Sequence, residues 1–343
     1  MPQNSPFVYS DTNKRYHTYD YYLRRRYGSK CARIPIDAGF SCPNREGGMG
    51  GCIYCSARGS GDFCAKGTAE GTAMGTADGI LSPAAQFAHE YDRLSAKWAG
   101  RLPAIPYFQA FSGTYAPTAD LRALYDAALS YTDRDGRPVD IPAISIATRP
   151  DCLSRETVAY LTELNTHADV TVELGLQSSH DATLRRIRRG HDYETFLRGF
   201  EALRRAGIAV CVHIINGLPT EDADVESREQ MLQTAARLGA LRPDFVKIHM
   251  LHVLRNTPLA DEYERGHAAL LSQEDYVSTV CDQLGLLPPE TVICRLTGDG
   301  PAEDVIAPLW TKNKRAVLAA IDRTMAGQNR CQGDRFTGGD LPS

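Results

Sequence analysis

The feature of this sequence that most constrains the fold is a regular alternation of short apolar runs with stretches of helical period. The apolar runs cover 31–38, 104–111, 143–148, 170–176, 208–215 and 245–254, and helical patterns cover 83–98, 118–131, 154–165, 181–188, 193–205 and 225–238. Strands that alternate with helices form right-handed βαβ units around a parallel sheet. Six units within 31–270 fit a curved, partial (β/α)6 barrel better than two lobes, and a doubly wound open sheet is the alternative.

The pattern changes after residue 271. A helix over 272–287, a strand-like stretch over 291–298 and a helix over 311–325 follow. We therefore expect an N-terminal segment (1–30), a core barrel (31–270), a short C-terminal α/β extension (271–335) and a disordered tail (336–343). The stretch 66–79 is rich in Gly, Thr and Ala and has no apolar period, so we expect a mobile surface loop there.

The charge balance and the apolar content exclude several classes of protein. The chain has 343 residues, with 38 basic and 42 acidic side chains and a formal net charge of −4. This balance argues against a globally basic nucleic-acid coat but leaves room for a local basic patch. The N-terminus has no apolar leader, and no window is apolar enough for a transmembrane helix. We expect a cytoplasmic protein without a membrane partner.

Three of the ten cysteines are clustered. Cys42, Cys52 and Cys55 follow the first predicted strand in the pattern C-x9-C-x2-C, within a glycine-rich loop. The carboxyl ends of strands are where barrel proteins assemble their active sites. Thiolates bind iron–sulfur clusters and zinc, and Cys64 could supply a fourth zinc ligand. The spacing favours an iron–sulfur site over zinc, and a redox pair or inert buried cysteines remain further alternatives.

The cysteine motif resembles that of the radical S-adenosylmethionine (SAM) superfamily, in the branch with a long first gap that includes the Elongator catalytic subunit. Several stretches resemble the bacterial YhcC/YtqA family more closely: ARIPIDAGFSCPNREGGMGGCIYC, YFQAFSGTYAP, ELGLQSSHDATLRRIRRGHDYETF, VHIINGLPTE, VKIHMLHVLRNTPLA and RLTGDGPAEDVIAPLW. The resemblance runs from about residue 15 to about residue 335. It implies a TIM-like radical SAM barrel.

The resemblance also implies the chemistry. Cys42, Cys52 and Cys55 would hold a [4Fe–4S] cluster through three irons, and Cys64 would not be a ligand. The fourth iron would bind the amino and carboxylate groups of SAM. An electron from the cluster, supplied by a reductant such as a flavodoxin or ferredoxin, would cleave SAM to methionine and a 5′-deoxyadenosyl radical. The cofactor supplies the difficult chemistry, while the protein orients it and excludes water.

Other residues are expected to bind SAM at the same rim. Tyr54 resembles the position near the adenine, with ordinary loop packing as the alternative. Gln177, at the end of the stretch that begins with Glu173, resembles a SAM-binding glutamine of coproporphyrinogen-oxidase-type relatives, and Glu173 is assigned to the same site. Arg189, twelve residues after Gln177, would bind the SAM carboxylate, for which a guanidinium is a natural partner. Gly217 resembles an adenine-side turn, and a simple strand-ending turn is its alternative.

Two positions depart from the family pattern or have a second interpretation. Relatives carry a Gly-Gly-Glu-like stretch where this chain has Phe-Ser-Gly-Thr-Tyr over 111–115, so the SAM amino group would meet Ser112, Thr114 or backbone carbonyls. For Arg189 and the arginines before it (Arg185, Arg186 and Arg188), the alternative is a solvated helix face, and a phosphate-contacting patch is the second interpretation of the run.

The substrate follows from the resemblance alone: YtqA-type relatives imply conversion of carboxymethylaminomethyluridine to aminomethyluridine at the tRNA wobble position. Basic runs at 185–189 and 312–315, and the tyrosine- and arginine-rich stretch 16–27, could bind unpaired RNA. A radical SAM enzyme with a small-molecule or protein substrate is one alternative. A non-catalytic iron–sulfur or zinc scaffold is another.

Overall fold

The computed structural model describes residues 5–46, 48, 50–59, 64, 81–98, 100–222, 224–298 and 300–338. The loop predicted over 66–79 therefore lies outside the described residues, as do residues 339–343 of the predicted tail. Within the described ranges, no helix is both long and apolar enough to cross a membrane.

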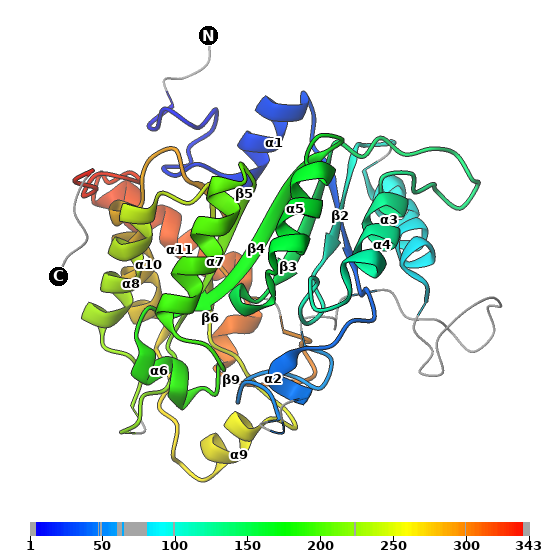
Figure 1. Cartoon of the computed structure of the whole chain (residues 1–343). Coiled ribbons are helices and arrows are strands. Elements are labelled where there is room, and N and C mark those ends of the chain that lie inside the picture. The colour runs from blue at the N-terminus through cyan, green and yellow to red at the C-terminus, as the bar shows by residue number, and fades with distance from the viewer. Residues whose placement is uncertain are drawn as a thin grey trace.

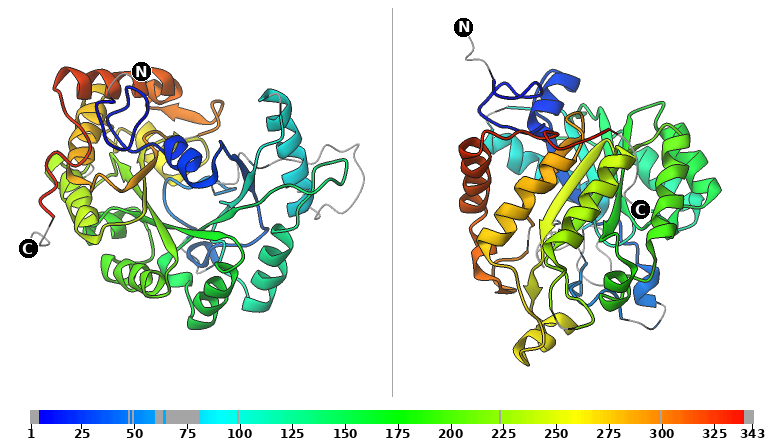
Figure 2. Two further views of the ribbon diagram at one scale, coloured as in Figure 1. Left: turned by 90° about the horizontal axis from the view of Figure 1, so that it is seen from above. Right: turned by 90° about the vertical axis from the view of Figure 1, so that its left-hand side faces the viewer.

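One curved parallel sheet organises the described chain (Figures 1 and 2). Its seven strands follow one another in chain order: β1 (Ala32–Ile36), β2 (Ala104–Phe108), β3 (Ala143–Thr148), β4 (Asp169–Gln177), β5 (Ala209–Asn216), β6 (Phe245–Met250) and β8 (Val292–Arg295). A doubly wound sheet would reverse its strand order part-way across, and this sheet does not. The predicted barrel-like sheet is therefore confirmed, and the doubly wound alternative is excluded.

Helices cover the convex face of the sheet, as Figure 2 shows from above. Those of the βαβ repeat are α3 (Pro83–Lys97), α4 (Thr118–Ala128), α5 (Arg155–Leu164), α6 (Asp181–Arg186), α7 (Tyr193–Arg205) and α8 (Arg228–Leu241). Side chains cap several of them: the Ser154 hydroxyl accepts from the Thr157 amide, and Ser227 forms a capping box with Gln230. These polar caps satisfy the first amides of each helix and fix where it begins.

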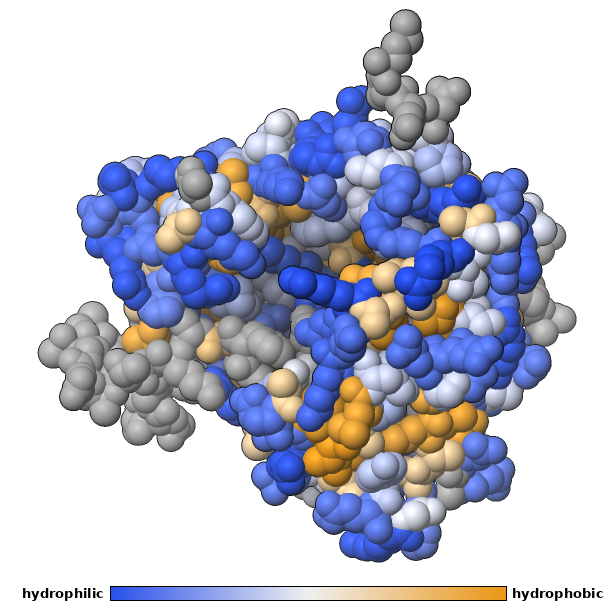
Figure 3. Space-filling view, turned by 180° about the vertical axis from the view of Figure 1, so that it is seen from behind, coloured by the Kyte–Doolittle hydropathy of each residue, from blue (hydrophilic) through white to orange (hydrophobic). Residues whose placement is uncertain are grey.

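The apolar core lies between the sheet and these helices. Alternate strand residues such as Ile34, Ile146, Val172 and Val212 are fully buried in it. Because successive strand side chains point to opposite faces, the residues between them face the concave side, which we call the lumen. The space-filling view from behind shows a hollow near the centre of that side, bordered by both hydrophilic and hydrophobic residues (Figure 3).

The C-terminal part of the chain completes the sheet. The strand predicted over 291–298 is β8, and it pairs in parallel with β6. The strand predicted over 245–254 is divided, because the chain turns after β6 and residues Val253–Leu254 (β7) pair antiparallel with Val305–Ala307 (β9). The helices of this part are α9 (Pro258–Glu264), α10 (Gln273–Leu286) and α11 (Lys314–Gly327).

A helix that the sequence patterns did not predict, α1 (Tyr19–Tyr27), lies at the open side of the curved sheet (Figure 2). Tyr16 is buried, and the rings of Tyr19 and Tyr22 pack edge-on against Phe245 with centroids 6.1 and 5.1 Å away. These tyrosines stabilise the interior and are not free to stack on RNA.

Two of the three arginines of α1 form ion pairs within the protein. Arg24 pairs with Asp11 and Asp20, and Arg26 pairs with Asp169. Arg25 and Arg26 remain exposed. The structure therefore turns part of the stretch 16–27 inward, and its use as an RNA surface stays a prediction.

Candidate active site

The three clustered cysteines lie on the loop that follows β1. Cys42 directly precedes the short helix α2 (Pro43–Glu46), and the Cys55 amide donates to the Cys52 carbonyl at 3.0 Å. Asn44 holds this loop against the segment after α6: its Nδ2 donates to the Arg188 carbonyl at 2.6 Å and lies 3.5 Å from Cys52 Sγ. The cysteines therefore sit on a braced loop at the carboxyl end of the sheet.

The surroundings of these thiols suit metal ligation. Burial, together with the neighbouring Cys52, raises the pKa of the Cys55 thiol to about 12, although Arg45 and Arg189 act in the opposite direction. A thiol with so high a pKa is neutral at pH 7, and it becomes a thiolate when a metal displaces its proton. The Cys55 thiol is thus not activated to act as a free nucleophile.

The loop thiols do not converge on a single point in the ligand-free protein. Among the described residues, neither the three loop cysteines nor Cys64 belongs to a group of three ligand atoms within 4.8 Å of one another. Thiolates are ligands both for zinc, which takes them at about 2.3 Å, and for the separate irons of a cluster.

Arg189 lies beside the cysteine loop. The residue is buried, its Nε and Nη2 donate to the Gly175 carbonyl at 3.2 and 2.6 Å, and its Nη1 lies 3.9 Å from Cys52 Sγ. Burial lowers the pKa of Arg189, but Cys52 and Tyr54 outweigh that effect and raise it. Arg189 is therefore a fixed positive charge at the position where the sequence predicted one.

The neighbouring arginines behave differently from Arg189. Arg185 and Arg188 are exposed, while Arg186 forms an ion pair with Glu262 at 2.5 Å. Arg189 is therefore buried, and Arg185 and Arg188 face solvent. Either of the two interpretations of these exposed arginines, a solvated face or a phosphate patch, is compatible with their placement.

A bulge at the end of β4 shapes the wall of the site. The register with β5 shifts between Gly175 and Gln177, and Gln177 takes a φ of +76°. A side chain on Gly175 would place its Cβ 2.6 Å from Arg189 Nη2 and 2.7 Å from Gln177 Nε2. Glycine at this position lets both polar groups approach the backbone closely. Bulges and left-handed residues of this kind are common next to active sites.

The stretch after β2 contributes one unpaired hydroxyl. The Ser112 amide donates to the Ser41 carbonyl at 3.3 Å, which places it next to Cys42. Ser112 is fully buried, and its Oγ has no hydrogen-bond partner in the described part of the protein. Thr114 is different: its Oγ1 lies 2.6 Å from Thr148 Oγ1 and donates to the Cys152 carbonyl at 2.6 Å. Of the two predicted contacts, Ser112 is the one with capacity for a ligand.

Tyr54 and Gly217 occupy different surroundings. Burial, followed by the nearby Cys52, raises the pKa of Tyr54, so this ring lies next to the ligand loop. Gly217 has a φ of +88°, and a Cβ there would lie 3.2 Å from the side chain of Leu271. Gly217 thus allows the turn after β5 to pack closely against the C-terminal part.

Glu173 lies below these groups, in the lumen. Its carboxylate accepts from Arg33, accepts from Lys247 Nζ at 2.5 Å and lies 2.8 Å from His213 Nε2. Burial would raise the pKa of Glu173, but the charges of Arg33 and Lys247 hold it well below its ordinary value. Both oxygens of Glu173 are thus engaged by protein groups.

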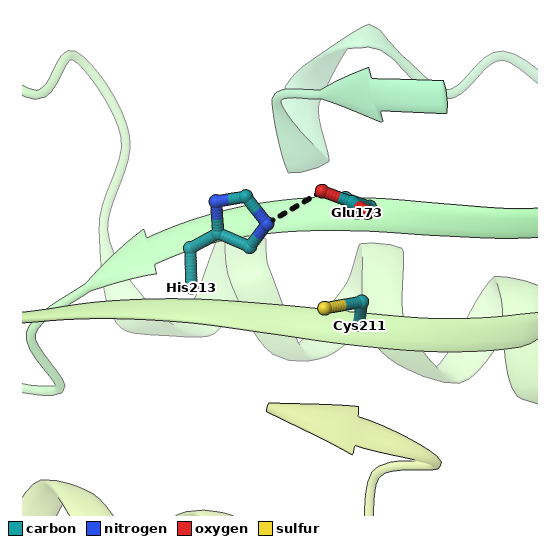
Figure 4. Close-up of side chains that lie close together, drawn as sticks. All are labelled: Glu173, Cys211 and His213. Carbon is teal, nitrogen blue, oxygen red and sulfur yellow. Dashed lines mark hydrogen bonds and ion pairs between the residues drawn. The ribbon is translucent and has the colours of Figure 1, made fainter. Parts of the chain in front are cut away.

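Ligand atoms of Glu173, Cys211 and His213 lie within 4.8 Å of one another and could by type hold a metal ion (Figure 4). The figure shows the three side chains on the adjacent strands β4 and β5, with His213 directed at the carboxylate. However, Arg33 and Lys247 already neutralise Glu173, and two cations in contact with the carboxylate would repel a third. We therefore interpret this group as part of a lumen ion network.

Comparison with known proteins agrees with this geometry. The family model of the radical SAM superfamily matches residues 42–235, and the radical SAM C-terminal domain matches 243–327. YtqA of Bacillus subtilis is 44% identical over 339 residues, which is 98% of this chain and 97% of YtqA. YhcC of Escherichia coli K12 is 34% identical over 304 residues, which is 88% of this chain and 89% of YhcC.

The chain belongs to the radical SAM superfamily. It is similar at greater distance to a protein named tRNA uridine(34) acetyltransferase from Methanocaldococcus infernus, with 26% identity over 164 residues, 48% of this chain and 30% of that protein. The solved structure of archaeal Elp3 from the same organism has a TM-score of 0.63 at 16% identity and covers 88% of this chain and 64% of that one. This structural likeness concerns the fold.

As a radical SAM enzyme, the protein uses a [4Fe–4S] cluster and SAM. The residues present fit both groups: three thiols on a braced loop, a buried guanidinium 3.9 Å from one of them, and a buried hydroxyl without a partner. The close approach of Arg189 and Gln177 to Gly175 provides a polar wall beside the loop.

Sequence patterns missed Asn44, Arg33 and Lys247. Asn44 lies inside the cysteine loop and could be recognised only by its contacts with Cys52 and Arg188. Arg33 and Lys247 did leave a signal, because each is a charged residue within an otherwise apolar strand. Charges at such positions are rarely buried without a partner, and they indicate that one face of the sheet is polar.

Proposed function

We propose that this radical SAM enzyme acts on the side chain at carbon 5 of the wobble uridine of tRNA in the cytoplasm. The reaction breaks the bond between the side-chain nitrogen and the carboxymethyl carbon and so converts the carboxymethylaminomethyl group to aminomethyl. SAM serves as the two-electron oxidant, water supplies the oxygen, and the two-carbon fragment leaves as glyoxylate. The observation that carries the proposal is the pair of exposed arginines, Arg185 and Arg188, on the segment that braces the cysteine loop. Exposed arginines beside an active site suit the phosphates of a nucleic acid whose base enters that site.

Two further observations support a tRNA substrate. A distant relative is named for uridine 34 of tRNA. Lys312 and Arg315, in the basic run of the C-terminal part, are also exposed. None of these features depends on the stretch 16–27, part of whose aromatic rings pack inward.

The roles of the site residues follow from their placement. Cys42, Cys52 and Cys55 hold the cluster, which supplies reductive cleavage of SAM to methionine and a 5′-deoxyadenosyl radical. Arg189 binds the carboxylate of SAM, because it is a buried cation beside Cys52. Ser112 accepts from the amino group of SAM with its unpaired hydroxyl.

The remaining contacts complete the binding of SAM. Tyr54 packs along the adenine, and Gln177 offers its amide from the bulge of β4. Thr114, Glu173 and Gly217 support the site indirectly. The polar groups of Thr114 and Glu173 bond to neighbouring residues, and Gly217 leaves room for a close approach of the Leu271 side chain. A flavodoxin or ferredoxin supplies the electron.

The first experiment tests the cofactor site. The protein is reconstituted anaerobically with iron and sulfide, reduced in the presence of SAM and assayed for 5′-deoxyadenosine. We expect the product to disappear when Cys42, Cys52 or Cys55 is replaced by Ala, and to persist in the matched control Cys64→Ala. One zinc bound per chain, without a cluster, would contradict the assignment and restore Cys64 as a ligand.

The second experiment tests the substrate. The reconstituted enzyme is incubated with tRNA that carries carboxymethylaminomethyluridine, and the nucleosides are separated by mass. We expect aminomethyluridine to accumulate, and we expect Arg185→Ala combined with Arg188→Ala to weaken tRNA binding and reduce its salt dependence. Arg205→Ala is the control, because Arg205 is an exposed arginine at the C-terminal end of α7. Unchanged tRNA in the presence of active SAM cleavage would reject this substrate.

A further inference from the structure

The lumen of the half-barrel carries an ion network that the cofactor site does not use. Arg33 of β1, Tyr107 of β2, Glu173 of β4 and Lys247 of β6 meet there from four strands. Lys247 and Glu173 are almost fully buried, with side chains 4% and 2% exposed. Burial of charged groups carries a large desolvation cost, so the network requires a functional or structural reason.

Cations outnumber the carboxylate within this network. Glu173 is in contact with both Arg33 and Lys247, and these two cations also flank the ring of Tyr107 at 3.7 and 4.5 Å from its centroid. Burial and the charge of Arg33 lower the pKa of Lys247, although Glu173 acts in the opposite direction. Glu173 therefore compensates only part of the positive charge around it.

Two buried nitrogen atoms of this region lack partners in the described part of the protein. In the described part of the protein, neither Arg33 Nε nor His249 Nε2 makes a hydrogen bond, although both atoms are buried. The ring of His249 stacks on His213, which itself contacts Glu173. Buried polar atoms without partners are rare in folded proteins and are often satisfied by a ligand.

The depth of the network in the lumen also suits contact with a substrate group. Glu173 precedes Gly175 by two residues on β4, and Gly175 accepts from Arg189 beside the cysteine loop. A strand rises about 3.3 Å per residue, so the network lies about 7 Å below the Arg189 contact. The aromatic contacts of α1 with Phe245 lie at the opposite end of the strands. A substrate group that entered past the cofactors would reach the cations before the aromatic residues.

We propose that Arg33, Lys247 and His249 form a lumen site that binds a carboxylate of the substrate. The proposal deepens the proposed function and rests on it for the source of the carboxylate, which is the carboxymethyl end of the modified uridine. The cations would hold that end in the lumen while the rest of the side chain extends toward the cofactors. Glu173 keeps Lys247 and Arg33 oriented when no substrate is bound.

The test compares two nucleosides that differ by one charge. Binding of 5-carboxymethylaminomethyluridine and of its carboxamide to the reconstituted, SAM-bound protein is measured by titration calorimetry. We expect the acid to bind about tenfold more tightly or better, because charge-assisted hydrogen bonds are roughly twice as strong as neutral ones. Uridine 5′-monophosphate is titrated in parallel, since a phosphate could use the same cations. Preferential binding of the monophosphate would overturn the carboxylate assignment.

Variants locate the preference in the lumen. Lys247→Met should bring the acid-to-amide ratio close to one, Lys247→Arg should retain it, and Lys97→Met, an exposed lysine of α3, should leave it unchanged. Thermal unfolding and iron content report whether each variant folds. The wild-type comparison of acid and amide needs no variant, so equal affinities there would reject the site outright.

The outcomes separate this inference from the proposed function. Turnover of tRNA without any acid preference would reject the lumen site and leave the substrate standing. An acid preference that depends on Lys247, combined with unchanged tRNA, would support the lumen site and reject the tRNA substrate.

Discussion

Arg189 and Cys52 are separated by 137 residues in the chain, yet Nη1 of the arginine lies 3.9 Å from the sulfur of the cysteine. The contact joins the segment after α6 to the loop after β1. It places one permanent positive charge beside the thiols, in a buried environment where charge interactions are strong. The candidate site is therefore assembled from segments that follow distant strands of one sheet, and Arg189 joins two of them.

Replacement of Arg189 should separate SAM binding from cluster binding. We expect Arg189→Ala to weaken SAM binding by about tenfold to a hundredfold, the loss of a charge-assisted pair, while iron content stays near that of the wild type. Equilibrium binding of SAM and iron analysis measure the two quantities. Arg185→Ala, an exposed arginine of α6, is the matched control. Unchanged SAM affinity in Arg189→Ala would remove this residue from the site.

Gly175→Ala should disturb the same wall without unfolding the protein. The added Cβ would lie 2.6 Å from Arg189 Nη2 and 2.7 Å from Gln177 Nε2, so both side-chain ends must move. We expect SAM affinity to fall by about tenfold or more. Gly327→Ala is the control, since a Cβ there meets nothing within 4 Å and should stabilise α11 by up to about 1 kcal/mol. Equal SAM affinity in the two variants would contradict the prediction.

Ser112 and Thr114 should respond in opposite ways to loss of the hydroxyl. Ser112→Ala removes a buried oxygen without a partner, so the SAM-free protein should be as stable as the wild type or more stable, while SAM binds more weakly. Thr114→Val removes a hydroxyl that donates at 2.6 Å and should lower the free energy of unfolding by about 1–3 kcal/mol. Denaturant unfolding and SAM titration test the pair, and a large loss of stability in Ser112→Ala would refute it.

Asp282 should make the stability of the C-terminal part depend on pH. Its carboxylate pairs with Arg228, Arg330 and Arg335. Burial would raise the pKa of Asp282, but the hydrogen bond from Arg330 and the charge of Arg228 lower it below its ordinary value of 3.8. The stabilisation is therefore fully present above about pH 4 and is lost as the pH falls through the lowered pKa.

We expect Asp282→Asn to reduce the free energy of unfolding at pH 7 by about 3 kcal/mol, because three arginines lose their partner. Urea unfolding at several pH values measures the difference, which should shrink as the pH falls below 4. Asp11→Asn, which breaks an exposed pair with Arg24, should have a much smaller effect. A loss that is constant down to acidic pH would show that the carboxylate charge is not its cause.

The strand and helix pattern and the cysteine motif were readable from the sequence because both depend on local spacing. Alternating apolar runs gave the parallel sheet, and C-x9-C-x2-C after the first strand indicated the metal-binding loop. The position of Arg189, fixed by its distance along the chain from Gln177 in related proteins, also lies where the resemblance implied.

The tertiary structure decided the features that depend on residues far apart in the chain. It added β8 to the sheet, because β8 satisfies the free backbone groups at the edge of β6. Sequence patterns do not reveal which strands pair. It turned the tyrosines of α1 inward against Phe245 and engaged both oxygens of Glu173 with Arg33 and Lys247. The sequence by itself determined the repeated strands and helices of the barrel and the loop that carries the thiols; only folding decided which charges are buried together, because burial is a property of the whole packed sheet.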